Sequence, residues 1–126
     1  MPSNKSILVV DDEFDIVNII KHFLQKQGFT TYAFTDPSLA LEHLKINSKN
    51  YGLVLVDVRM PGMNGFDLVK KIKSIDPAIK ILLMSAFEFN DLEVSKVLNS
   101  IKIDGYVQKP ISAKELINII EEYFQN

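Results

Sequence analysis

The chain of 126 residues contains no cysteine and no tryptophan, and its single arginine is Arg59. Without cysteine it can form neither a disulfide framework nor a thiolate metal site. Long apolar runs are also missing, because the longest have four residues, as in Ile81–Met84, whereas a membrane span needs about 20. The first residues lead into a strand pattern without the apolar core of a signal peptide. We therefore expect a cytoplasmic location.

A strong charge of either sign is absent too. The formal net charge is −2, with 24% charged and 47% hydrophobic residues, so a basic surface for nucleic acid is not expected and the composition is typical of a globular chain. His22 and His43 have no ligand spacing around them, and we expect ordinary surface or boundary residues. The length suits one domain over residues 1–126, with a core from about 6 to 124.

Strand patterns and helical patterns alternate along the chain. The segments Ile7–Val10, Leu53–Val56 and Ile81–Met84 are apolar throughout, which is typical of strands buried on both faces of a parallel sheet. Thr30–Phe34 is more polar and alternating, so we expect it at a sheet edge, and Tyr106-Val107 belongs to a last short strand. This alternation predicts an α/β fold of five βα units, doubly wound, with right-handed crossovers.

Five helical patterns accompany these strands, and local signals mark several of their ends. The first stops at Gly28, and the third ends before Asp76-Pro77. The second begins at Asp36-Pro37, a capping residue followed by proline at the first helical position. The fourth starts near Asn90-Asp91, and the fifth opens with a capping box at Ser112–Glu115.

Polar residues follow four of the predicted strands where each one ends. Asp11 and Asp12 follow the first strand, Asp57 the third, Ser85 the fourth and Lys109 the fifth. Ligands of open parallel sheets bind beyond the carboxyl ends of the strands. We therefore expect these side chains to converge at one rim of the sheet.

Carboxylates gathered at such a rim repel one another. At about 4 Å and an effective dielectric constant of about 20, each ionised pair costs roughly 4 kcal/mol, a large part of the roughly 5–15 kcal/mol of a whole domain. The cluster therefore needs a cation, a shared proton or a wide spacing. Ligands that are all oxygen favour a hard ion. Mg²⁺ is the expected ion, with Mn²⁺ as an alternative, because it binds through one or two carboxylates together with phosphate oxygens.

Simpler interpretations stay open for the individual residues. Asp12 could cap the first helix, Lys109 could be a surface lysine, Ser85 a strand-end serine and Arg59 a solvated loop residue. The position of the Lys109 ammonium beside a Mg²⁺ site is explained if a dianion binds between the ammonium and the metal ion. Ser85 could then donate a hydrogen bond to that anion, and Arg59 could cover Asp57 and slow the attack of water.

Four motifs together resemble the receiver domain of two-component response regulators. They are Val9–Glu13, Asp57–Gly65, Met84–Ala86 and Lys109-Pro110, all at predicted strand ends and in that order. The resemblance extends over residues 6 to 124. It implies a flavodoxin-like five-stranded sheet in the order 2-1-3-4-5, as in a chemotaxis member of that family.

The resemblance implies a role for each rim residue. Asp57 resembles the phosphoacceptor, and Lys109 the lysine that pairs with the phosphoryl group. Asp12 resembles a direct Mg²⁺ ligand, Asp11 a ligand that acts mainly through water, and the backbone carbonyl of Arg59 a further ligand. The domain would take part in phosphorelay signal transduction. It would not be an enzyme in the usual sense, because it would catalyse only its own phosphorylation and dephosphorylation.

The resemblance also implies a switch and partners. Ser85 stands where the family has Thr or Ser to follow the phosphoryl group, Tyr106 matches the switch aromatic, and the Lys109-Pro110 bond resembles the family's cis peptide. The phosphodonor would be a sensor histidine kinase, a phosphotransfer protein or a small phosphodonor. A downstream protein would bind the face made by the fourth helix, fifth strand and fifth helix. A monomer or weak homodimer is expected, without contact to nucleic acid or membrane.

Three other functions compete with this interpretation. A haloacid-dehalogenase-like phosphatase also uses a nucleophilic Asp. That class resembles an Asp-x-Asp motif at the nucleophile, whereas here Arg59 stands in the place of the second Asp. A flavodoxin-like electron carrier needs a hydroxyl- and glycine-rich loop after the first strand to hold a phosphate, and Asp11–Glu13 would repel that phosphate. The third is a receiver fold that only binds partners and is never phosphorylated.

Overall fold

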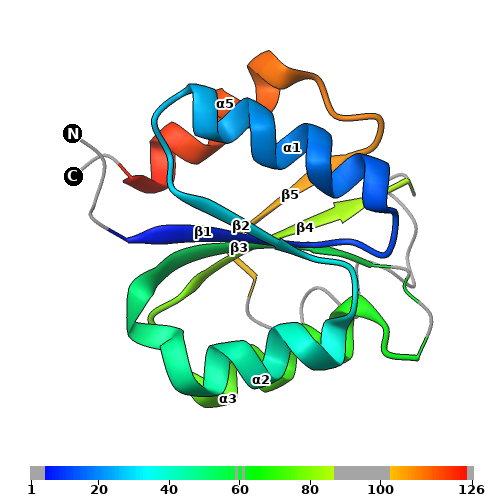
Figure 1. Ribbon diagram of the computed structural model, residues 1–126, viewed down its shortest axis with the longest axis vertical. Coiled ribbons are helices and arrows are strands. Elements are labelled where there is room, and N and C mark those ends of the chain that lie inside the picture. The colour runs from blue at the N-terminus through cyan, green and yellow to red at the C-terminus, as the bar shows by residue number, and fades with distance from the viewer. Residues whose placement is uncertain (1–4, 59, 61, 87–102, 125–126) are drawn as a thin grey trace.

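The computed structural model describes residues 5–58, 60, 62–86 and 103–124. Five parallel strands form one sheet in the order β2-β1-β3-β4-β5, which confirms the predicted fold. Helices α1 and α5 cover one face of this sheet, and α2 and α3 cover the other (Figure 1). The elements are β1 (Ser6–Val10), α1 (Phe14–Lys26), β2 (Thr31–Phe34), α2 (Pro37–Asn47), the 3₁₀ turn η1 (Ser48–Asn50), β3 (Tyr51–Asp57), α3 (Gly65–Ile75), β4 (Lys80–Ser85), β5 (Gly105–Gln108) and α5 (Ala113–Phe124).

The core consists of two apolar layers, one on each face of the sheet. Successive side chains of a strand point to opposite faces, so the continuous apolar runs supply both layers. On β3, Val54 and Val56 pack in the layer under α2 and α3, whereas Leu53 and Leu55 pack in the layer under α1 and α5. All four side chains are fully buried. The central strands are therefore apolar at every position because neither face meets water.

The edge strand and the helix ends follow the sequence signals. Strand β2 lies at an edge of the sheet, and its Tyr32 is half exposed. Gly28 ends the first helix region with φ +94°, a conformation that glycine adopts without strain. The carboxylate of Asp36 accepts a hydrogen bond from the Ser38 backbone N–H at 2.8 Å, and the Ser112 hydroxyl accepts one from the Glu115 N–H at 3.1 Å. Both predicted caps are thus present.

The predicted fourth helix, near Asn90-Asp91, lies outside the described residues.

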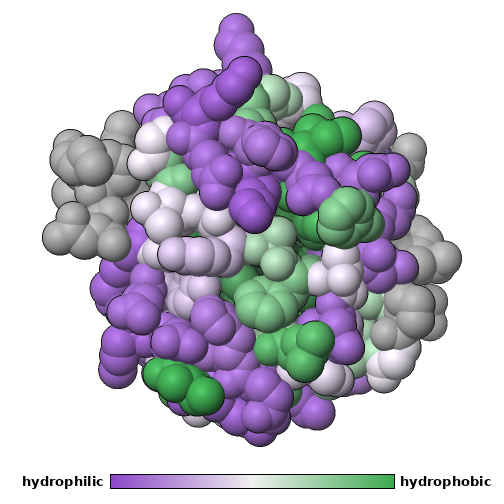
Figure 2. All heavy atoms as spheres, viewed as in Figure 1, coloured by the Kyte–Doolittle hydropathy of each residue, from purple (hydrophilic) through white to green (hydrophobic). Residues whose placement is uncertain are grey.

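On the face seen in Figure 2, hydrophobic residues lie in small groups among polar ones, as is ordinary for a globular surface. None of the helices in the described part of the chain combines the length and the apolarity that crossing a bilayer would require.

Candidate functional site

The carboxyl ends of the strands bring the predicted residues to one rim. Asp11 follows β1, Asp57 is the last residue of β3, Ser85 the last of β4, and Lys109 follows β5. Carboxylate oxygens of Asp11, Asp12 and Asp57 all lie within 4.8 Å of one another. The expected convergence of the carboxylates is therefore present in the folded chain.

Lys109 joins two of these carboxylates. Its Nζ lies 2.6 Å from Asp11 Oδ2 and 3.1 Å from Asp57 Oδ1, and Asp11 is fully buried while Asp57 is 6% exposed. The Lys109 backbone N–H also donates to the Ser85 carbonyl at 2.7 Å. The peptide bond between Lys109 and Pro110 is cis, as the sequence resemblance implied. The surface-lysine interpretation of Lys109 is therefore wrong.

Asp11 is held by the chain that follows it. Its Oδ1 accepts a hydrogen bond from the Glu13 backbone N–H at 3.0 Å, while Oδ2 faces Lys109. The residue that caps α1 is Glu13, and it makes no side-chain cap hydrogen bond. Asp12 is therefore not the cap of the first helix, and it lies exposed at the mouth of the cluster. The sequence signal for this turn was Asp11 itself, since aspartate commonly bonds the backbone N–H two residues on.

Burial and charge raise the pKa of Asp57 from 3.8 to about 6. The largest cause is loss of water around the carboxylate, followed by the negative charge of Asp11, while Lys109 acts in the opposite direction. For Lys109, burial favours the neutral amine, but the hydrogen bonds and charges of Asp11 and then Asp57 outweigh it and raise the pKa. At neutral pH the site therefore holds an ammonium beside a mostly ionised Asp57 carboxylate.

The charges of this cluster fit a divalent cation. Three ionised carboxylates and the ammonium of Lys109 sum to −2 (−3 + 1). The ligand atoms in the described part of the cluster are all oxygens, and hard ions such as Mg²⁺ prefer such ligands. Asp12 and Asp57 have the freest oxygens, since Asp11 uses one on Glu13 and one on Lys109.

The loop after β3 is built on two glycines. Gly62 has φ +84°, a conformation that side chains rarely adopt. At Gly65, where α3 begins, an added Cβ would overlap the Asp57 carbonyl oxygen and the Val58 Cα. The Gly65 N–H also donates to the Val58 carbonyl at 2.7 Å. The two glycines thus let the start of α3 rest directly on the backbone of Asp57.

The remaining predicted residues have different positions. Ser85 is 3% exposed at the end of β4, next to Met84, which stands opposite Asp57 in the strand register. Tyr106 lies in β5, half-buried and opposite Leu83. Arg59, whose carbonyl was the expected further metal ligand, lies outside the described residues.

Comparison with known proteins gives the family. Residues 7–121 match the family model of the response regulator receiver domain. The chain belongs to this family. Among curated relatives, it is 29% identical to sporulation initiation phosphotransferase F of Bacillus subtilis, covering 95% of this chain and 94% of that protein. It is 32% identical to the response regulator SaeR of Staphylococcus epidermidis over 88% of this chain but only 46% of that protein. The receiver domain thus spans about half of several relatives that it matches.

Solved structures agree with the fold of this receiver domain. A receiver domain protein from Methanospirillum hungatei superimposes with a TM-score of 0.86 at 28% identity, covering 97% of this chain and 94% of that one. The receiver domain of the Francisella response regulator 1452 gives 0.80 at 30% identity, covering 96% and 97%. The CheX–CheY complex from Borrelia burgdorferi, solved with BeF₃ and Mg²⁺, gives 0.85 at 21% identity, covering 97% and 90%, and shows the fold alone.

Family membership bears on two of the three competing functions that the sequence left open. It supports signal transduction by a response regulator receiver, and not the phosphatase or the flavin carrier. Receiver domains of response regulators are in general not conventional enzymes.

We predict that Gly65→Ala destabilises the receiver domain by about 1–3 kcal/mol, because the new methyl group must displace the Asp57 carbonyl or Val58. Glycine to alanine within a helix usually stabilises by roughly 0.5–1 kcal/mol, so the sign of the change is the test. Urea unfolding measures it. Ser74→Ala, at an exposed position of α3, should change stability by less than about 0.5 kcal/mol. A stabilising Gly65→Ala would contradict the close approach.

A second prediction concerns pH. Because the pKa of Asp57 is raised from 3.8 to about 6, the folded state holds this proton more tightly than the unfolded state. The stabilisation from Asp57 is present below about pH 4 and is lost as pH rises through 6. Asn is neutral at every pH, so in metal-free buffer Asp57→Asn should match the wild type near pH 4 and exceed it by about 2–3 kcal/mol at pH 7. Urea unfolding of both proteins measures this difference across the pH range. A difference in stability that stayed constant from pH 4 to pH 7 would refute the raised pKa of Asp57.

Proposed function

We propose that this receiver domain accepts a phosphoryl group on Asp57 and passes the signal on through its protein-binding surface. The observation that carries the proposal is the position of Asp57, at the carboxyl end of a central strand and 3.1 Å from the ammonium of Lys109. Asp57 is also beside two further carboxylates in an oxygen-only cluster. A nucleophile, a positive charge and a candidate metal site thus lie side by side.

In the proposed reaction, one Oδ of Asp57 attacks the phosphorus of the donor. A new P–O bond forms, giving an aspartyl phosphate. The P–N bond of a phosphohistidine, or the P–O bond of acetyl phosphate, breaks, and imidazole or acetate leaves with the electron pair. The attacking carboxyl must be ionised, and a pKa of about 6 leaves Asp57 mostly ionised at pH 7. The domain therefore supplies its own nucleophile without a separate general base.

Charge neutralisation is the main contribution that phosphoryl transfer asks of a protein. Lys109 is positioned to neutralise an oxygen of the incoming phosphoryl group, because its Nζ already contacts Asp57. Asp12 and Asp57 would hold Mg²⁺ directly and Asp11 mainly through water. The backbone carbonyl of Arg59, which lies outside the described residues, would be a further ligand. When bound, the ion neutralises the acidic cluster and the negative charge of the phosphoryl oxygens.

Once Asp57 carries a phosphoryl group, the balance of charges at the rim changes. The dianion competes with Asp11 for Lys109, and the Ser85 hydroxyl donates to a phosphoryl oxygen. Tyr106, two residues before Gln108 at the end of β5, turns inward behind Ser85. These movements bias an existing two-state equilibrium. The face that responds includes β5 and α5 together with the predicted fourth helix, which lies outside the described residues, and a downstream protein binds there.

The phosphodonor in this proposal is a sensor histidine kinase or a phosphotransfer protein. The name of the Bacillus relative, a phosphotransferase that this chain matches over 94% of its length, supports a place in phosphotransfer. Catalysis is limited to the domain's own phosphorylation and dephosphorylation, with Asp57, Lys109 and Ser85 as the catalytic residues.

Acetyl phosphate with Mg²⁺ should add one phosphoryl group to the wild-type protein, as intact-mass spectrometry would show. Asp57→Asn should stay unmodified, because an amide is no nucleophile for this reaction. Lys109→Gln should react about 100-fold more slowly, the typical loss when one stabilising group is removed. Asp67→Asn, at an exposed position of α3, should react like the wild type. Equal modification of wild type and Asp57→Asn would remove Asp57 from its role.

Mg²⁺ should raise the melting temperature, because it binds the folded cluster and not the unfolded chain. At ten times the dissociation constant the stabilisation is about 1.4 kcal/mol, or a few degrees for a domain of this size. Asp12→Asn should stabilise the metal-free protein by relieving repulsion and should weaken the response to Mg²⁺.

Asp15→Asn is the matched control for this metal experiment. Asp15 is an exposed acid in the first turn of α1 and lies outside the cluster, so its variant should keep the full Mg²⁺ response. Differential scanning calorimetry with and without the ion measures both. A wild type that does not respond to millimolar Mg²⁺, or an Asp12→Asn protein that is less stable without metal, would contradict the proposed site.

A further inference from the structure

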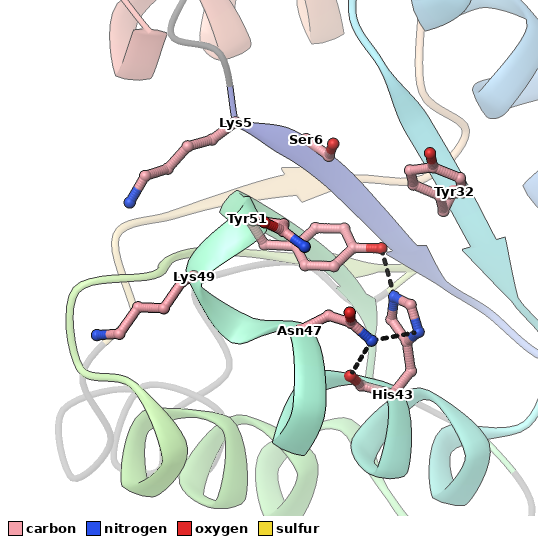
Figure 3. A pocket seen from close by; sticks show the side chains of 8 residues that line it. Lys5, Ser6, Tyr32, His43, Asn47, Lys49 and Tyr51 are labelled. Atoms are coloured by element: carbon pink, nitrogen blue, oxygen red, sulfur yellow. Dashed lines mark hydrogen bonds between the residues drawn. The ribbon is translucent and has the colours of Figure 1, made fainter.

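A hollow in the surface lies at the opposite end of the sheet from the acidic rim. It has a volume of about 600 Å³ and is lined at the amino ends of β1 and β3, by β2, and by the end of α2 with η1. Pockets that hold small molecules measure about 300–1,000 Å³. Figure 3 shows its side chains, with Tyr51 in the centre, Tyr32 and His43 toward one side and Lys5 and Lys49 toward the other.

The aromatic part of this hollow has a floor and a wall. Tyr51 is 3% exposed and forms the floor, while Tyr32 is 51% exposed and forms a wall. Their ring centroids are 6.3 Å apart and the ring planes meet at 76°. Such a corner offers one ring for stacking and another for an edge contact with a planar ligand.

Hydrogen bonds fix the polarity of the floor. Asn47 Nδ2 donates to the carbonyl oxygen and to Nδ1 of His43, at 3.0 and 3.2 Å. Because Nδ1 accepts, the ring proton lies on Nε2, which donates to the Tyr51 hydroxyl at 2.6 Å. The Tyr51 oxygen thus serves as an acceptor and keeps its own hydrogen to donate to a ligand. Burial, and next the charge of Tyr32, raise the pKa of Tyr51 to about 12, so that hydrogen is retained at neutral pH.

The charge of the hollow favours an anion. Among the described residues that line it, two are lysines and none is acidic. Lys49 lies 3.6 Å from Oδ2 of Asp76, whose side chain is 7% exposed, whereas the Lys49 side chain is 87% exposed. The Lys49 ammonium is therefore open to a second anion on its solvent side. Lys5 extends in the same direction as Lys49 (Figure 3).

We propose that this hollow binds a small aromatic molecule carrying a phosphate group, with the chemistry of a nucleoside monophosphate. The flat ring stacks on Tyr32 above the Tyr51 floor, and the dianionic phosphate lies between Lys5 and Lys49. The positive charges of the two lysines attract the phosphate, and the aromatic corner receives the planar ring. The site is separate from Asp57, because β1 and β3 run the length of the sheet between the two.

The test is a titration of the ¹⁵N-labelled chain with adenosine monophosphate in metal-free buffer, followed by two-dimensional NMR. We expect saturable shifts at the amides around Tyr32, Lys49 and Tyr51, with a Kd of about 1 mM or tighter. Adenosine and ribose 5-phosphate, which carry only the ring or only the phosphate, should each bind at least about tenfold more weakly. Shifts confined to the rim around Asp57, or no saturation at several millimolar ligand, would overturn the proposal.

Matched variants sharpen this test. Tyr32→Ala should weaken binding about tenfold, within the range for losing one stacking partner, whereas Tyr32→Phe should keep it. Lys49→Gln should weaken binding about two- to fivefold, and Lys45→Gln, outside the hollow, should not. Phosphorylation by acetyl phosphate should be unchanged in the Tyr32 variants, which shows that they are folded. Equal affinity of Tyr32→Ala and Tyr32→Phe would contradict the stacked position.

Discussion

The functional site depends on one buried arrangement of charge, in which Lys109 lies between Asp11 and Asp57. The 2.6 Å contact joins Lys109 to Asp11, 98 positions away in the chain, and the 3.1 Å contact joins it to Asp57. Carboxylates at the rim of an apolar sheet would otherwise repel one another without water to screen them. The ammonium offsets part of this repulsion and leaves a net charge of −2, which fits a site that takes up a divalent cation and then a phosphoryl group.

The fold supplies this arrangement through features that have no chemistry of their own. Parallel strands end together, so one rim collects residues from β1, β3, β4 and β5. The apolar layers on both faces bury the strands up to their last residues, which is why Asp57 loses water and has a raised pKa. Gly65 then allows α3 to begin against the Asp57 backbone. The raised pKa of Asp57 is thus a property of its position at the end of a buried strand.

The two ends of the sheet differ in charge. The carboxyl end gathers acids around one lysine, whereas the hollow at the amino end is lined by lysines and tyrosines and has no acid among its described residues. The first is suited to a cation and a covalent phosphoryl group, and the second to an organic anion. Because the two lie at opposite ends of the strands, a ligand in the hollow would leave the site at Asp57 unobstructed.

The sequence by itself determined the number and kind of elements and the residues that end each strand, because periodicity and caps are local signals. It also predicted that Asp57, the acids beside it and Lys109 lie at one rim, while the strand order came from family resemblance. Only the tertiary structure decided that Asp11 is buried on Lys109 while Asp12 is exposed, because neighbouring residues at a strand end point to opposite sides. The amino-end hollow was also hidden, since Tyr32, His43 and Lys49 belong to separate elements whose proximity depends on strand register and crossover packing.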